Sequence, residues 1–131
     1  MNAVVDVSSV AQILFQSAQK ERFLTVLHEA DLTLSPDLYV AELTNTVYKH
    51  HAKGIYTLAE CADFVEDGLQ CVDELVPSKT LWQEALAEGA KHSHSIYDML
   101  YLVTARRYAA VLLTNDKTLL AICAKLGVQT A

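Results

Sequence analysis

Short apolar stretches alternate along this chain with longer segments in which apolar residues recur at helical spacing. The stretches are rich in valine and leucine, and turn-forming residues bound them, a pattern typical of strands buried on both faces of a sheet. We therefore predict short strands at residues 3–7, 32–34, 71–76, 110–113 and 128–130.

Helices are predicted between these strands, at residues 10–16, 20–30, 36–53, 57–69, 78–90, 95–108 and 116–126. Serine or threonine caps mark several of their starts. These caps are Ser8 or Ser9, Ser35 ahead of Pro36, Thr57 in a capping box with Glu60, and Ser95 in a capping box with Asp98. Gly54 and Gly127 are the corresponding stop signals.

This order of elements predicts the fold class. Strands separated by helices need crossover connections, which produce a mainly parallel sheet with helices on both faces. The length of 131 residues suits one core, and the chain contains no repeat, linker or low-complexity segment. We predict a single α/β domain over residues 1–131.

Composition excludes several classes of protein. The chain is 52% hydrophobic, which is ample for a packed core and argues against disorder. Its longest apolar runs are too short to span a bilayer, and no secretory signal is visible at the N-terminus. The three cysteines, Cys61, Cys71 and Cys123, are widely spaced and form no CxxC pair. We therefore expect reduced thiols, no zinc site, no membrane association and a cytoplasmic location.

Four acidic residues occupy positions that one crevice can collect. Asp6 lies at the end of the first strand and Asp116 just past the fourth, and ligand sites of parallel sheets form beyond the carboxyl ends of strands. Asp98 lies in the first turn of the helix that leads into that fourth strand. Glu42 lies in the middle of a helix, beside its apolar face.

Each acid also has an explanation without a ligand. Asp98 would complete a capping box, Asp116 would favour the positive end of a helix, and Glu42 would be a solvated helix residue. Asp6 is the hardest to explain in this way, because an acid inside an apolar strand is costly to bury unless it is paired or binds a cation.

A metal ion would account for all four acids together. Two carboxylates about 4 Å apart repel by roughly 4 kcal/mol at an effective dielectric of 20, and a divalent cation removes that penalty. Hard oxygen ligands suit Mg²⁺ or Mn²⁺, which activate water and stabilise a transferring phosphoryl group. The formal net charge of −6 argues against nucleic-acid binding, but such a cation would bridge acidic protein and phosphate.

Four segments in this order resemble the PIN domains, in particular the short VapC-type toxin ribonucleases of prokaryotic toxin–antitoxin pairs. They are VVDVSS, SPDLYVAELTNTV, SIYDMLYL and LLTNDKTL, and the match spans essentially the whole chain. Met99 departs from the pattern, since a small residue commonly follows the aspartate.

The resemblance implies a three-layer α/β/α sandwich with the first and fourth strands adjacent at the centre. It implies that Asp6, Glu42, Asp98 and Asp116 bind Mg²⁺ or Mn²⁺, supported through hydrogen bonds by Ser8, Asn45 and Thr114. The implied reaction is endonucleolytic hydrolysis of RNA by metal-activated water. The implied partners are a second copy of the chain and an antitoxin that blocks the acidic pocket.

Other polar clusters carry weaker signals. The histidine pairs His50-His51 and His92/His94 lack a further ligand for a metal site, although His94 would be able to touch RNA near the pocket. The basic residues either contact phosphate or form a solvated face; they are Lys49, Lys53, Lys91, Arg106 and Arg107. Two alternative functions remain at this point: a non-catalytic PIN-like module that binds RNA or protein, and a phospho-acceptor signalling domain.

Overall fold

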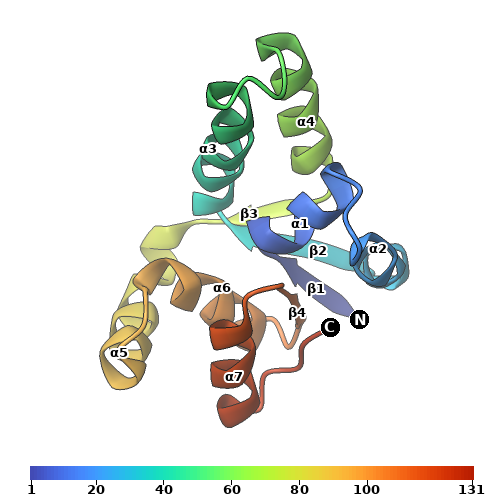
Figure 1. Ribbon diagram of the computed structural model, residues 1–131. Coiled ribbons are helices and arrows are strands. Elements are labelled where there is room, and N and C mark those ends of the chain that lie inside the picture. The colour runs from blue at the N-terminus through green and yellow to red at the C-terminus, as the bar shows by residue number, and fades with distance from the viewer.

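The computed structural model describes all 131 residues and contains a four-stranded parallel sheet with helices on both sides (Figure 1). The strands are β1 (Asn2–Val5), β2 (Leu32–Pro36), β3 (Glu74–Val76) and β4 (Val111–Leu113). The helices are α1 (Val7–Leu14), α2 (Lys20–Glu29), α3 (Leu38–Ala52), α4 (Leu58–Gln70), α5 (Trp82–His92), α6 (Ile96–Arg107) and α7 (Lys117–Leu126). The predicted α/β class and three-layer arrangement are thereby confirmed.

The strand order is β3-β2-β1-β4, so β1 and β4 are neighbours as expected. However, β4 lies toward the edge of the sheet and not at its centre. Beyond β4 there is only a single bridge, between Leu112 and Thr130, where the sequence pattern had predicted a last short strand.

The sheet buries a different apolar set on each face. Val4, Leu34 and Leu112 lie on neighbouring strands and belong to the large core that includes most of the buried face of α6. On the other face, Ala3 and its strand partner Val111 pack with Phe23 of α2. Figure 1 shows α1 to α4 on one side of the sheet and α5 to α7 on the other. These apolar layers hold the carboxyl ends of β1 and β4 side by side.

The first strand is shorter than predicted, and this changes the surroundings of Asp6. β1 ends at Val5, and Asp6 is the N-cap of α1, with its side chain accepting a hydrogen bond from the Ser9 amide. The prediction that Ser8 or Ser9 caps this helix was therefore wrong. An aspartate is as good a cap as serine, and capping by Asp6 starts the helix three residues earlier.

The start of α3 was also predicted too early. Ser35 and Pro36 belong to β2, because pairing with β3 extends that strand to Pro36, which lies opposite Val76. The Ser35 hydroxyl donates to the Val5 carbonyl inside the sheet and so cannot cap a helix. Residue Asp37 precedes α3 instead and makes no capping hydrogen bond.

Around β3 the chain is less regular than predicted. β3 has only three residues, because Cys71 is the C-cap of α4 and the Asp73 side chain accepts a hydrogen bond from the Thr33 amide. A 3₁₀ turn at Ser78–Thr80 follows Pro77, so α5 begins at Trp82. By contrast, the predicted capping box of Thr57 and Glu60 is present, and Gly54 and Gly127 have the positive φ expected of stop signals. None of the helices combines the length and apolar character needed to cross a membrane.

Candidate functional site

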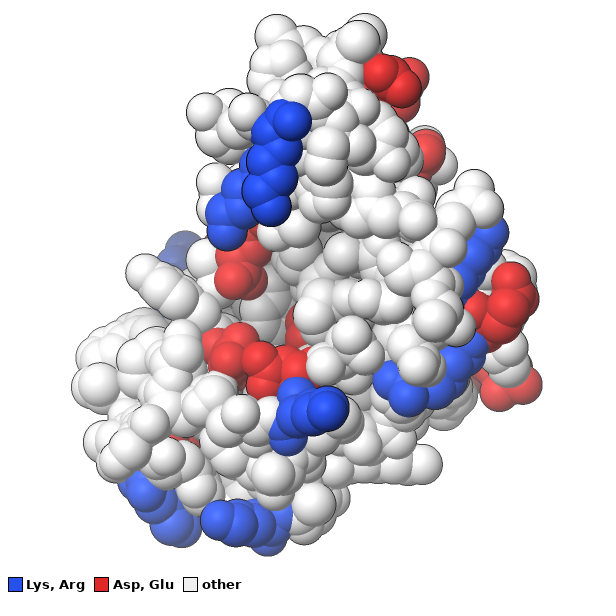
Figure 2. Space-filling view, in the orientation of Figure 1, with Lys and Arg blue, Asp and Glu red and all other residues white.

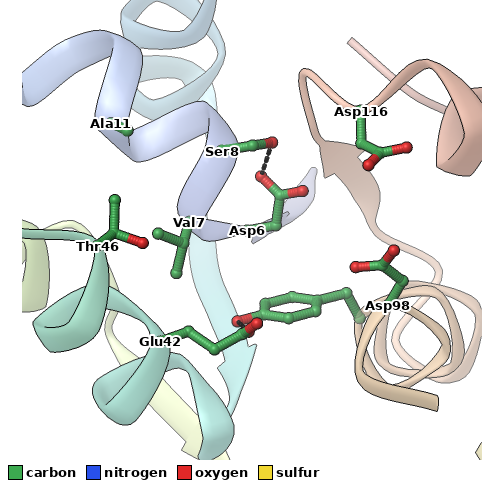
Figure 3. A pocket seen from close by; sticks show the side chains of 9 residues that line it. Asp6, Val7, Ser8, Ala11, Glu42, Thr46, Asp98 and Asp116 are labelled. Carbon is green, nitrogen blue, oxygen red and sulfur yellow. Dashed lines mark hydrogen bonds between the residues drawn. The ribbon is translucent and has the colours of Figure 1, made fainter. Parts of the chain in front are cut away.

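A pocket of about 220 Å³ opens beyond the carboxyl ends of β1 and β4. Its lining includes all four acids that the sequence singled out, and no lysine or arginine. The lining residues are Asp6, Val7, Ser8, Ala11, Glu42, Thr46, Asp98, Tyr101 and Asp116. Figure 3 shows the acids approaching this space from the start of α1, from α3, from α6 and from the start of α7. Segments far apart in the sequence thus deliver one carboxylate each.

Asp6 is the most buried of the four, with only 6% of its surface exposed. Its Oδ1 accepts hydrogen bonds from the Ser8 hydroxyl at 2.7 Å and from the Ser9 amide at 2.8 Å. Burial raises the pKa of Asp6 to about 6, and the hydroxyls of Thr114 and Ser8 with the Ser9 amide offset only part of that rise. A buried carboxylate without a cationic side chain beside it is held at a cost that a bound cation would remove.

Asp116 is held in the same way on the neighbouring strand end. It is the N-cap of α7, and its Oδ1 accepts from the Leu119 amide at 2.9 Å. The buried Thr114 hydroxyl accepts from the Asp116 amide and lies 3.3 Å from the Ser8 hydroxyl. Ser8 also accepts from the Asn115 amide at 2.8 Å. These contacts tie the two strand-end turns together, so Asp6 and Asp116 have a fixed spacing.

Glu42 reaches the pocket from α3 and is held by a side chain. The Tyr101 hydroxyl, almost fully buried, donates to Oε1 of Glu42 at 2.7 Å. Burial raises the pKa of Glu42; the Tyr101 hydrogen bond lowers it, and the charge of Asp98 raises it further. The negative charge of Asp98 thus acts on Glu42 across the pocket.

Asp98 has a partner that the sequence did not predict. The expected capping box is absent, because the Ser95 hydroxyl accepts from the Tyr97 amide while Asp98 makes no contact back to the Ser95 amide. Its Oδ2 instead lies 2.7 Å from Nε2 of His94. The Asp98 carboxylate therefore does not cap α6, and it lines the pocket.

The four carboxylates share one arrangement: each has one oxygen held by a protein donor and a second oxygen with no hydrogen-bond partner. As the side chains stand, no three of them converge closely enough to hold one metal ion. The donor set nevertheless fits Mg²⁺ or Mn²⁺ in chemistry, since four free carboxylate oxygens face one pocket that no cationic side chain lines. Side-chain rotations would have to bring them into coordination distance.

The predicted supporting residues fall into two groups. Ser8 and Thr114 lie in the hydrogen-bond network beside Asp6, whereas Asn45 is exposed and is not part of the pocket lining. Thr46 lines the pocket on that helix, one turn from Glu42. Sequence reasoning missed Thr46 and the role of Tyr101, although their spacings of four and three residues from Glu42 and Asp98 put them on the same helix faces.

The other polar clusters lie elsewhere. Arg106 and Arg107 of α6 pair with Glu84 of α5, and Arg106 also with Glu88, so they join two helices and are not free for phosphate. The Nε2 atom of His92 lies 3.2 Å from Glu88. Figure 2 shows acidic side chains gathered in a hollow of the drawn face, with lysine or arginine side chains at its margins.

Comparison with known proteins gives one family match. The sequence model of the PIN domain matches residues 3–125. Ribonuclease VapC3 of Pyrobaculum aerophilum is 26% identical over 121 residues, which cover 91% of this chain and 92% of the relative. The two chains therefore correspond over nearly their whole lengths.

Solved structures show the same fold at lower identity. PAE2754 from Pyrobaculum aerophilum superposes with a TM-score of 0.73 at 18% identity, covering 93% of this chain and 84% of that one. VapBC2 from Rickettsia felis, bound to a DNA fragment from its promoter, superposes with a TM-score of 0.71 at 14% identity, covering 100% of this chain and 98% of the matched one.

Proposed function

This chain belongs to the PIN domain family, and from that premise we propose that it is a metal-dependent RNA endonuclease, the toxin of a toxin–antitoxin pair. The observation that carries the proposal is the pocket, where four carboxylates from four separate elements each present one free oxygen. The name of the full-length relative from Pyrobaculum aerophilum, a ribonuclease, supports RNA as the substrate. Family membership also leaves no support for the phospho-acceptor alternative.

The proposed ligands are Asp6, Glu42, Asp98 and Asp116, with Mg²⁺ or Mn²⁺ as the cation. When bound, such an ion supplies an activated water and compensates the negative charge on the phosphoryl group. The contribution of the chain is to deliver one carboxylate from each of four separate elements to the pocket before substrate arrives. Because Val7 and Ala11 also line the pocket, its wall is partly apolar, which strengthens electrostatic interactions inside it.

The substrate's phosphates need cations, and the net charge of −6 makes their location important. Lys49 and Lys53 are exposed, form no ion pair, and follow Glu42 and Thr46 at helical spacing along α3. One face of α3 therefore leads from the pocket to two free ammonium groups. We propose that this face contacts the RNA backbone beside the cleavage point.

Partners and location complete the proposal. The resemblance to VapC-type chains, together with the structural neighbour VapBC2, supports an antitoxin as protein partner, and the same resemblance suggests a second copy of the chain. The three free cysteines suit a reducing compartment, so we propose that the protein acts in the cytoplasm.

The decisive experiment is cleavage of a labelled single-stranded RNA pool with Mg²⁺, with Mn²⁺ and with a chelator. Purified wild type runs beside a folded Asp6→Asn, Asp98→Asn double variant, and filter binding measures RNA retention in parallel. We expect cutting that needs the metal and disappears in the variant. Cutting that survives in the variant or in chelator would remove the four-acid proposal. RNA retention without any cutting would favour the alternative, a non-catalytic PIN-like binding module.

A further inference from the structure

His94 lies on the short turn between α5 and α6, beside the pocket. Its Nε2 is 2.7 Å from Oδ2 of Asp98, and its side chain is 15% exposed. Because an ionised carboxylate only accepts hydrogen bonds, Nε2 carries the proton and donates. We infer that His94 is a positioning residue: it holds Oδ2 of Asp98 so that Oδ1 faces the pocket. The inference rests on the proposed function, since it takes Asp98 as a metal ligand.

The backbone around His94 is built to keep it there. Ser93 ends α5 in the left-handed region, at φ +50°, a conformation that is costly for a residue other than glycine. This turn brings the His94 amide to the Gly89 carbonyl at 3.1 Å. A Cβ on Gly89 would lie 3.1 Å from the His94 carbonyl oxygen and 2.3 Å from Cδ1 of Ile96, so a larger residue there would require the Ile96 side chain and the turn to shift.

The hydrogen bond from His94 favours one of two possible orientations of the Asp98 side chain: toward the pocket or back toward the start of α6. Asp98 is the third residue of α6, where an acid commonly turns back to the amide of the N-cap, here Ser95. That local capping position is not used, and His94 holds the carboxylate instead. Without the imidazole, the carboxylate would be free to cap the helix, which would turn it away from the pocket. A metal-ligating carboxylate generally depends on such an outer hydrogen bond for its orientation.

The test compares His94→Ala with His94→Gln, because the glutamine amide reaches about as far as Nε2 and donates a hydrogen bond. His92→Ala is the matched control, since this histidine pairs with Glu88 and does not line the pocket. Calorimetric titration with Mn²⁺ measures metal affinity on folded protein at pH 7.5. Cleavage of RNA then gives kcat and KM separately.

We expect His94→Ala to weaken Mn²⁺ binding about tenfold to a hundredfold and to lower kcat with little change in KM. His94→Gln would recover most of both losses, His92→Ala would change neither, and His94→Ala would have no further effect on Mn²⁺ binding in an Asp98→Asn background. Wild-type Mn²⁺ affinity in His94→Ala, or equal losses in the alanine and glutamine variants, would overturn the inference. Failure of the proposed function shows separately, as a wild type that binds no Mn²⁺, and the inference would fall with it.

Discussion

The two halves of the pocket hold their acids by different means. On the strand-end side, Asp6 and Asp116 are helix N-caps, and a backbone amide donates to Oδ1 of each. On the helix side, Glu42 is held by the Tyr101 hydroxyl and Asp98 by the His94 imidazole. Moving the first pair breaks a hydrogen bond that caps a helix, whereas moving the second pair breaks only a bond between two side chains.

This difference bears on how a metal would be bound. No three acids are close enough to hold one ion as they stand, so some side chains must shift. We expect Glu42 to make the larger shift toward the pair formed by Asp6 and Asp116, and Asp98 to turn its Oδ1 toward that pair while its Oδ2 stays bonded to His94. The strand-end half would then define the position of the ion, and the helix half would close around it.

The largest expected effect comes from neutralising one acid in each half. Asp6→Asn and Glu42→Gln should both lower cleavage more than about 10³-fold, since each removes a proposed ligand of the cation. Their effects on stability should differ. Asparagine also caps helices well, and Asp6→Asn removes a buried charge, so the metal-free variant should be more stable than wild type at neutral pH.

The comparison is made by urea unfolding of metal-free protein together with initial cleavage rates. Glu42→Gln serves as the matched control, because this acid is less buried than Asp6 and its neutralisation should stabilise the protein less. An Asp6→Asn protein that is less stable than wild type at pH 8 would contradict the view that Asp6 is held at a cost.

An effect of intermediate size is expected when the stability cost of the buried Asp6 carboxylate is measured as a function of pH. Because the pKa of Asp6 is raised from 3.8 to about 6, its contribution to stability is fully present below pH 4 and is lost as pH rises through about 6. The loss amounts to about 3 kcal/mol, and the raised pKa of Glu42 acts in the same direction. The free energy of unfolding of Asp6→Asn, minus that of wild type, should therefore grow from near zero at pH 4 to about this value above pH 7.

Measurements in chelator give this difference directly, and Mg²⁺ should reduce it above pH 6, where ionised Asp6 would bind the cation. A difference that stays constant between pH 4 and pH 8 would mean that Asp6 does not titrate in this range.

The two halves of the pocket also differ in how well they could be predicted from the sequence. The strand-end acids follow from topology: an acid after each of two buried parallel strands predicts a shared crevice, and β1 does pair with β4. The residue that caps α1 could not be predicted, because Asp6, Ser8 and Ser9 are all good N-caps. Only the end of β1 at Val5 selects Asp6.

The helix half depends on tertiary packing that no local pattern encodes. The bond from Tyr101 to Glu42 joins residues 59 positions apart, and it forms only because α3 and α6 meet at the pocket. The contact between His94 and Asp98 depends on the left-handed conformation of Ser93, which the sequence of residues 93–95 does not predict. That an acid follows each of two buried strands is thus predictable from the apolar runs, whereas the exact end of β1 and the hydrogen-bond partners of helix residues require the fold.

The smallest expected effects test whether backbone and side-chain support differ in strength. Tyr101→Phe removes the hydrogen bond that holds Oε1 of Glu42. We expect about a tenfold loss in Mn²⁺ affinity and in kcat, and a decrease of roughly 1 kcal/mol in the free energy of unfolding. Ser8→Ala removes a hydrogen bond of equal length to Asp6, together with the bond that Ser8 accepts from the Asn115 amide. The Ser9 amide still holds the same oxygen of Asp6 at 2.8 Å, so the loss in Mn²⁺ affinity and kcat should be about threefold or less. Calorimetry and cleavage rates on both variants make the comparison. If Ser8→Ala proves as damaging as Tyr101→Phe, the backbone amide does not fix Asp6 by itself, and the two halves of the pocket are equally adjustable.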